Sequence, residues 1–297
     1  APKYGTVYLC AGGQTESFTV KKSLTILGAK YGIDPNVRGA KESDPWTLNP
    51  ERGAHETMMT GRINLGADAT RVYDEAPEII VDGLCLGGKG DIYSYNGLEG
   101  EATLTLKNIY VSSNVATSYI FFLAPYQPSG FSNAYRRYVT MENVRVEGLT
   151  EAAGLLRLNA ERADISGVYM DAACTAIFLA DASASNGPDD EVVWNIHDNM
   201  FAATVGRGIY LNWDNPSSNG VSLSAGVAAR SRIVNNVYNN IFVNNYPTDS
   251  SDNNSTLSFR LKTENVYFNI ENNAFYQTRE PLENHQTIGG YCDYAQR

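Results

Sequence analysis

The chain has 297 residues, with 33 acidic and 23 basic side chains and a formal net charge of −10 at pH 7. This acidic balance argues against nucleic acid as a partner, because phosphate binding needs a basic surface. No apolar run approaches the about 20 residues that a helix needs to span a bilayer, so we expect no transmembrane segment.

The first predicted feature in chain order is the segment 28–61. It is too long for an ordinary connection, so we expect it to pack as a cap or side flap. No linker-like Pro/Ser stretch divides the chain, and a hydrophobic content of 43% is ample for a continuous core. We therefore expect one domain, 1–297, with 28–61 as an insertion within it.

From residue 81 onward a six-residue pattern recurs seven times: apolar, any, Asn/Gly/Asp, two further residues, apolar. In chain order its third positions are Gly83, Asn108, Asn143, Gly167, Asp198, Asn239 and Asn272. These residue types adopt the left-handed backbone conformation at least cost, so each copy predicts a strand, a sharp corner and a second strand. Asn residues at successive corners can also stack into a ladder of amide hydrogen bonds.

The spacing between copies is irregular, from 24 residues (Met141 to Ile165) to 41 residues (Ile196 to Val237). This is typical of a constant core with loops of variable length. A further strand is predicted before most copies, at Asp91–Tyr95, Tyr119–Leu123, Leu155–Asn159, Ala176–Ala180, Gly208–Asn212 and Leu257–Lys262.

Three short parallel strands per repeat predict an all-β, three-sheet solenoid of about 8 to 10 coils. A β-sandwich or jelly roll is the alternative, but it explains the alternation of apolar residues without explaining the repeated corner.

The stretch 5–28, GTVYLCAGGQTESFTVKKSLTILG, resembles the opening coil of right-handed parallel β-helix proteins. That pectate lyase-like superfamily includes pectate lyases, pectin methylesterases and many bacterial surface proteins. The following AKYGIDPN at 29–36, with Arg38, Glu42 and the MTG at 59–61, resembles an insertion in secreted bacterial β-helix proteins. The resemblance implies a right-handed parallel β-helix and a secreted or bacterial cell-surface location. It implies no single activity, because β-helices host lyases, hydrolases, esterases and non-enzymes.

The four cysteines are Cys10, Cys85, Cys174 and Cys292. They form no CxxC motif and none lies near a histidine at metal-ligand spacing. We expect small apolar residues in or near the core, with a disulfide between neighbouring coils as the alternative that would fit secretion.

In β-helix carbohydrate enzymes, the resemblance implies, substrate lies along the sheet of first strands between walls made by loops. Alternation places Leu156, Leu158, Ile177, Leu179, Ile209, Leu211, Phe259 and Leu261 inward. The outward set is then Arg157, Asn159, Phe178, Tyr210, Asn212, Arg260 and Lys262, with Trp213 at the edge and Tyr93, Tyr119 and Phe121 extending the column.

Aromatic faces stack on sugar rings and arginine recognises carboxylates, so this surface predicts polysaccharide binding, with acidic glycans favoured. The predicted substrate-binding residues are Asn159, Phe178, Tyr210, Asn212 and Trp213. The alternative is an ordinary outer ladder of mixed polar and aromatic residues. The longest predicted loops, 124–137, 181–191, 213–231 and 245–256, would flank this surface.

Two alternative sets of candidate catalytic residues can be named, one for a glycosidase and one for a lyase. A glycosidase needs two carboxylates about 5–10 Å apart, and Asp181 and Asp214 occupy comparable places one coil apart, unless they are ordinary turn residues. A polysaccharide lyase needs a base and often Ca²⁺, and its candidate bases or carboxylate clamps are Arg157, Arg207, Arg260 and Lys262.

The acidic run 189–191 could bind Ca²⁺ through oxygen ligands, although such a run is more often a solvated loop. The segment 193–198, VWNIHD, resembles the VWIDH segment of pectate lyases only superficially, because His and Asp are reversed. The repeat places His197 and Asp198 at a corner, which favours a structural role.

These features predict an extracellular carbohydrate-interacting protein that acts as a monomer. Two functions remain open: a polysaccharide lyase-like enzyme acting on acidic glycans, with glycoside hydrolysis less favoured, or a non-catalytic cell-surface glycan-binding, scaffold or adhesin module.

Overall fold

The structure is a computed structural model. It describes residues 4–36, 40–41, 44–48, 56–65, 77–94, 102–115, 119–123, 137–149, 154–158, 160–172, 175–180, 191–202, 208–213, 232–243, 255–261, 266–276 and 286–292. Throughout these ranges the regular secondary structure is β-strand, and no helix occurs. The described ranges accordingly offer no apolar helix that could cross a membrane.

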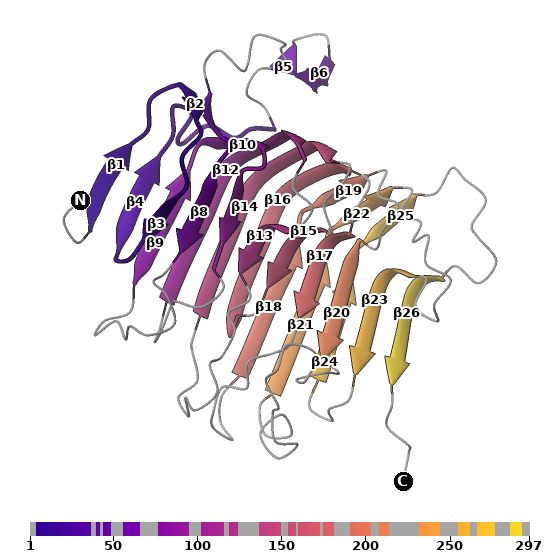
Figure 1. Cartoon of the computed structure of the whole chain (residues 1–297). Coiled ribbons are helices and arrows are strands. Elements are labelled where there is room, and N and C mark those ends of the chain that lie inside the picture. The colour runs from indigo at the N-terminus through magenta and orange to yellow at the C-terminus, as the bar shows by residue number, and fades with distance from the viewer. Residues whose placement is uncertain are drawn as a thin grey trace.

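Two parallel sheets make up most of the molecule (Figure 1). The larger has 15 strands, and its main path is β1 (Gly5–Tyr8), β4 (Leu24–Leu27), β9 (Glu78–Asp82), β12 (Ala102–Asn114), β14 (Arg137–Leu149), β16 (Arg162–Ala172), β18 (Glu191–His197), β21 (Arg232–Tyr238) and β24 (Val266–Glu271). Its shorter strands are β2 (Gly12–Gln14), β7 (Thr57–Met59), β10 (Leu84–Gly88), β19 (Met200–Ala202), β22 (Ile241–Val243) and β25 (Ala274–Tyr276).

Among the described residues the smaller sheet has nine strands, and their spatial order follows the chain. They are β3 (Phe18–Val20), β8 (Arg62–Leu65), β11 (Asp91–Tyr93), β13 (Tyr119–Leu123), β15 (Gly154–Leu158), β17 (Thr175–Ala180), β20 (Ile209–Trp213), β23 (Ser255–Leu261) and β26 (Gln286–Cys292). All six strands predicted before the repeat copies are confirmed here, with ends that differ by a few residues. Stacked, mainly parallel sheets of this kind are compatible with a β-solenoid.

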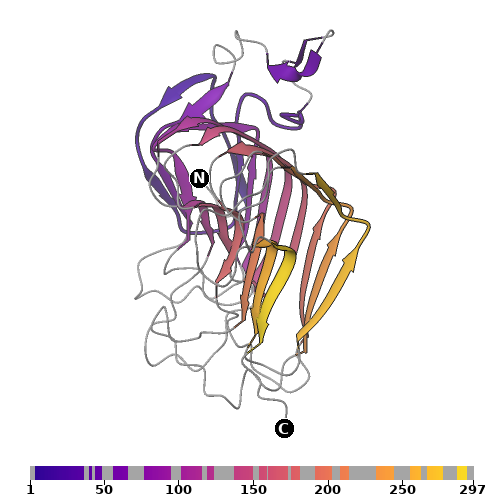
Figure 2. The ribbon, with the colours of Figure 1, turned by 90° about the vertical axis from the view of Figure 1, so that its right-hand side faces the viewer.

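The predicted corners are confirmed at all seven third positions of the repeat. Each has a positive φ, between 53° at Asn272 and 77° at Gly83. β12, β14 and β16 continue through the corner, so the segments before and after it belong to one hydrogen-bonded sheet. Figure 2 shows the larger sheet bending and lying opposite the smaller one. Hydrogen bonding therefore groups the three strands expected per repeat into two sheets.

The core lies between the sheets, and the two apolar positions of each copy contribute to it together with the inner residues of the smaller sheet. The first positions from Val81 to Val237 are fully buried, as are the sixth positions from Leu86 to Phe201, and Phe242 is 2% exposed. In the seventh copy Ile270 and Phe275 are only half-buried against this core. The apolar pattern thus marks the inside of the molecule.

The insertion begins by running along the corners. The backbone N–H of Gly32 donates to Asp82 Oδ1 at 3.0 Å, and Asn36 Nδ2 donates to the Gly167 carbonyl at 3.1 Å. β5 (Ala40–Lys41) and β6 (Asp44–Leu48) then form an antiparallel pair that lies apart from the two large sheets (Figure 1).

Two cysteines fall in fully described positions. Cys85 is buried, as expected of a core thiol, and Cys10 is exposed. Neither of these two forms a disulfide. Cys174 lies outside the described residues, so its state stays a prediction.

Candidate functional site

The smaller sheet carries a column of residues in register on its outer face. The pairing of consecutive strands aligns Asn64, Tyr93, Phe122, Arg157, Phe178, Tyr210 and Ser258. Neighbouring strands lie about 4.8 Å apart, so each member is one strand spacing from the next. We call this row the smaller-sheet column.

Aromatic rings and guanidinium groups are in contact at the N-terminal end of the column. Phe122 stacks on Tyr93 with ring centroids 4.6 Å apart and 19° between the ring planes. The Arg62 Cζ lies 4.1 Å from the centre of the Tyr93 ring. Such contacts hold both the ring and the cation in place.

Arg62 is also fixed by a bidentate ion pair with Asp91. Its Nε and Nη2 donate to the two carboxylate oxygens at 2.7 and 2.6 Å. This hydrogen bonding raises the pKa of Arg62. The Asp91 side chain is 4% exposed whereas that of Arg62 is 39% exposed, so solvent meets the cation rather than the carboxylate.

Arg157 extends the same arrangement to the next strand. Its Cζ lies 5.2 Å from the Phe122 ring centre and 5.8 Å from that of Tyr119. Arg157, Tyr93 and Tyr119 are half-buried, but Phe122 and Tyr210 are each only 8% exposed. Arg62, Tyr93, Tyr119 and Arg157 are all half-buried and form an accessible cluster at the column, which we call the Arg–Tyr cluster.

The register brings several predicted site residues together. Arg157, Phe178 and Tyr210 align in the smaller-sheet column. Asn212 aligns with Arg260, and Trp213 aligns with Leu261. Asn159, Asp181, Arg207, Asp214 and Lys262 lie outside the described residues, so the Asp181–Asp214 pair and the lysine base stay predictions.

One outward residue of the predicted column lies on the wrong face. Phe121 is fully buried in the core, and its neighbour Phe122 takes the column position opposite Arg157. The run Tyr119–Leu123 contains no polar residue. Alternation alone therefore could not tell its inner face from its outer face.

The larger sheet carries a row of polar side chains. It lies on the outer face of the strands that precede the corner. Asn269 Nδ2 donates to Asn236 Oδ1 at 2.7 Å, and Asn236 Nδ2 donates to Asn195 Oδ1 at 2.8 Å. Asn195 Nδ2 then donates to Asp164 Oδ2 at 3.3 Å. All three amides donate in the same direction, so this row, the Asp–Asn row, ends on a carboxylate.

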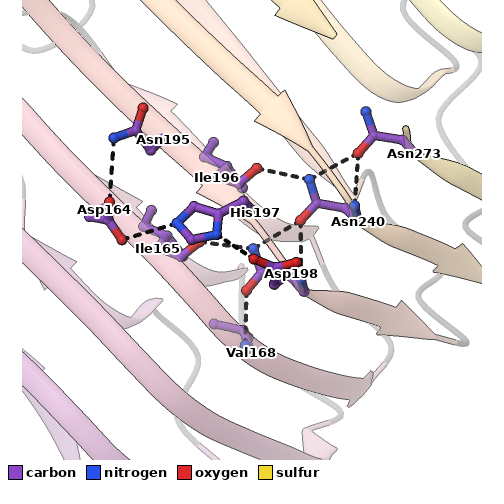
Figure 3. A network of polar contacts seen from close by, with 10 residues as sticks. Asp164, Ile165, Val168, Asn195, Ile196, His197, Asp198, Asn240 and Asn273 are labelled. Carbon is purple, nitrogen blue, oxygen red and sulfur yellow. Dashed lines mark hydrogen bonds and ion pairs between the residues drawn. The ribbon is translucent and has the colours of Figure 1, made fainter. Parts of the chain in front are cut away.

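His197 lies next to this row, between two carboxylates (Figure 3). Its Nδ1 is 2.7 Å from Asp198 Oδ2, and its Nε2 is 3.3 Å from Asp164 Oδ1. The His197 ring also stacks on Tyr238, with centroids 4.7 Å apart. Burial, and then the charges of Asp164 and Asp198, raise the pKa of Tyr238.

The corner placement of Asp198 is confirmed by its φ of 55°. The link from His197 to Asp164 could not be found from the local sequence, since it depends on the register of β16 with β18.

A surface depression of about 400 Å³ opens beside the Asp–Asn row, across β14, β16 and β18. Two aligned rows line it: Tyr138, Arg162 and Val193, then Thr140, Asp164 and Asn195. Glu191 also lines it, and its Oε1 accepts from Arg232 Nη1 at 2.9 Å. Sequence reasoning missed this site because its residues are distant in sequence.

Within the described ranges, no group of three or more His, Cys, Asp or Glu side chains could hold a metal ion. Of the acidic run proposed for Ca²⁺, only Glu191 is described, and it binds Arg232. A Ca²⁺ site therefore stays a prediction.

A scan against protein-family models and searches of curated proteins and solved structures found no match to this chain. Its binding chemistry therefore has to be inferred from its two outer faces. These faces differ in composition: the Arg–Tyr cluster presents guanidinium groups and tyrosine rings, whereas the depression combines the carboxylates of Asp164 and Glu191 with the guanidinium of Arg162.

Proposed function

We propose that this protein is an extracellular, carbohydrate-interacting β-helix protein that binds an acidic polysaccharide along the smaller sheet. The Arg–Tyr cluster carries the proposal. Guanidinium groups recognise carboxylates, and tyrosine rings provide flat apolar faces for sugar rings. The Arg62 guanidinium is 39% exposed whereas its Asp91 partner is 4% exposed, so this face presents a cation to solvent. This gives a local positive charge on a chain of net charge −10.

The finer fold that we propose is a right-handed parallel β-helix of nine coils, related to the pectate lyase-like superfamily. The nine strands of the smaller sheet, ordered as in the chain, support one coil per strand. The resemblance at residues 5–28 supports the handedness and the family. On that family's pattern, the outer face of the first-strand sheet is where a polysaccharide lies.

Binding is the primary proposal, and uronate-cleaving lyase activity is the second candidate. Lyase activity needs a base and a cation that neutralises the substrate carboxylate. Arg157 supplies positive charge in the described part of the face, which suits recognition and also the lyase role. The two candidates share one surface and differ only in turnover, so one experiment addresses both.

Affinity electrophoresis over a panel of polyuronates, with and without Ca²⁺, tests the proposal. We expect retardation by at least one acidic polymer, and weakening of about tenfold or more in Arg157→Ala, because a hydrogen bond to a charged group contributes about 1.5–3 kcal/mol. Arg157→Lys should recover only part of the loss, since lysine keeps the charge without the planar fork.

Arg232→Ala is the matched control. It removes the same charge from the larger sheet, where the Arg232 Cζ lies 5.1 Å from the Tyr267 ring centre. Binding should be unchanged in this variant. Equal losses in both variants, or no retardation by any acidic polymer, would overturn the proposal. A gain in ultraviolet absorbance from unsaturated uronides would establish turnover.

A further inference from the structure

We propose a second binding site, in the depression on the larger sheet, that takes a neutral sugar residue. The site lies on a different sheet from the Arg–Tyr cluster and has different chemistry, so it does not rest on the acidic-glycan proposal. Its volume of about 400 Å³ falls within the range of small-ligand sites, which is about 300–1,000 Å³.

The depression is lined by one aromatic side chain, that of Tyr138, together with polar, charged and apolar residues. Tyr138 is half-buried at one end of its row, and the Cζ of the exposed Arg162 lies 5.9 Å from the Tyr138 ring centre. Val193, the third lining residue of that row, contributes an apolar side chain. A pyranose ring offers both C–H faces and hydroxyl groups, which suits an aromatic surface beside polar groups.

Asp164 is held ready to accept hydrogen bonds from hydroxyl groups. Its side chain is 46% exposed, and each carboxylate oxygen already has one protein contact, Oδ1 with His197 and Oδ2 with Asn195. A carboxylate has about four acceptor positions, so each oxygen retains capacity for a second donor. The protein contacts fix the position of the carboxylate before a ligand arrives, which lowers the entropy lost on binding.

Asn195 is positioned in the same way. Its Nδ2 donates to Asp164 and its Oδ1 accepts from Asn236 at 2.8 Å. These two contacts fix which end of the amide is the donor and which is the acceptor. The amide therefore offers its second N–H and its second lone pair at defined positions, one strand spacing from the Asp164 carboxylate.

The charges that line the depression favour a neutral sugar over an acidic one. The lining has the carboxylates of Asp164 and Glu191 and the guanidinium of Arg162, and Glu191 is paired with Arg232. A uronic acid bound against Asp164 would bring two carboxylates together, and like charges in proximity oppose binding. A neutral sugar meets both the donors and the acceptors of the lining without that penalty, so the geometry favours neutral over acidic residues.

Saturation-transfer NMR and calorimetry with maltotetraose, cellotetraose and mannotetraose test the site, with tetragalacturonate as the acidic comparator. We expect at least one neutral tetrasaccharide to bind, with little dependence on salt. Tyr138→Ala should weaken it by about tenfold or more, and Asp164→Asn should weaken it in the same direction. Tyr138→Phe, which keeps the ring, should bind nearly as well as the unchanged chain.

Tyr267→Ala is the matched control, because Tyr267 lies in the same aligned row as Tyr138 but outside the depression. Its binding should be unchanged. The inference fails if no neutral tetrasaccharide binds. It also fails if Tyr138→Ala and Tyr267→Ala lose affinity for the neutral tetrasaccharide equally, or if Tyr138→Ala weakens the binding of tetragalacturonate alone. Arg157→Ala should leave neutral binding intact, which separates failure here from failure of the acidic-glycan proposal.

Discussion

The corner is built differently in the first four copies of the repeat and in the last three. In the four copies from Val81 to Met170 the fourth position is apolar: Leu84, Ile109, Val144 and Val168. In the last three copies it is Asn199, Asn240 and Asn273. In the first group β12, β14 and β16 run through the corner, and only at Gly83 do the strands, β9 and β10, stop on either side of it. Val144 aligns with both Ile109 and Val168. In the second group the strands stop on either side of the corner.

The asparagine side chains take over the hydrogen bonds where the strands stop. Asn240 Oδ1 accepts from the Asn199 backbone N–H at 3.2 Å and from Asn199 Nδ2 at 3.0 Å. Asn240 Nδ2 donates to the Ile196 carbonyl and to Asn273 Oδ1 (Figure 3). A buried amide can thus replace a segment of backbone ladder when all its groups are satisfied.

Asn240→Val should have the largest effect of the changes considered at the corners. Asn240 is fully buried, and its loss removes partners from the Asn199 N–H and the Ile196 carbonyl. Each buried unsatisfied group costs about 1–3 kcal/mol, so the free energy of unfolding should fall by about 3 kcal/mol or more. Urea denaturation measures the change.

The reciprocal change, Val144→Asn, tests whether the two halves really differ. It places an amide between Ile109 and Val168, whose side chains offer no hydrogen bond, so it should also destabilise, by about 1–3 kcal/mol. If the free energy of unfolding of both variants stays within about 0.5 kcal/mol of that of the unchanged chain, the amide ladder does not account for the difference between the two groups of corners.

Gly83→Ala should come next and should be specific to the first half. A Cβ on Gly83 would lie 2.1 Å from the Tyr31 backbone nitrogen, and φ there is 77°. We expect a loss of about 2 kcal/mol or more, because both strain and backbone overlap must be relieved. Hydrogen exchange at the Gly32 N–H should also accelerate, since that group donates to the adjacent Asp82.

Asn272→Ala is the comparison in the second half. Its φ is 53° and the residue is exposed, so only the cost of a left-handed alanine applies, about 1 kcal/mol. If Asn272→Ala lowers the free energy of unfolding as much as Gly83→Ala does, the contact of the insertion with the Gly83 corner does not add to the cost of a side chain there.

The smallest expected effect concerns the tyrosine of the second half. Burial raises the pKa of Tyr238, and the charges of Asp164 and Asp198 add to it. Asp164→Asn should therefore lower this pKa without restoring the ordinary value of about 10. NMR of ring-labelled tyrosine, assigned with Tyr238→Phe, follows the titration. A pKa unmoved by Asp164→Asn would show that this carboxylate has no influence.

The sign of the stability effect follows from that shift. Below about pH 10 the phenol is neutral in both the folded and the unfolded chain. Above it the unfolded chain ionises more readily, so the stability contributed by neutral Tyr238 is lost as pH rises through the raised pKa. The alkaline fall in stability should be shallower in Tyr238→Phe, and in the unchanged chain it should begin above the ordinary tyrosine pKa.

The repeat was sufficient to predict the corners and the core, because both depend on local residue type. Gly83 and Asn108 mark positions of positive φ, and Val81 and Leu86 mark the buried face. The expected asparagine ladder is confirmed at the fourth positions from Asn199 onward.

The contacts between strands were less accessible to sequence reasoning. Asp164 meets His197, and Tyr138 shares a depression with Asn195, only because the register across β14, β16 and β18 aligns them. Loops of irregular length conceal that register in the sequence. In β13 the absence of polar residues left Phe121 and Phe122 indistinguishable, and packing against the core decided between them.

The Asp–Asn row also bears on how such a chain can lengthen during evolution. Each amide passes a donor to one neighbour and receives one from the other. A duplicated asparagine-bearing unit placed between Asn195 and Asn236 would therefore meet an acceptor on one side and a donor on the other. Beyond Asp164 the same unit would face carboxylate oxygens, which accept hydrogen bonds as amide oxygens do. The donor-to-acceptor order of the row is thus repeatable from Asn195 onward and is interrupted at Asp164.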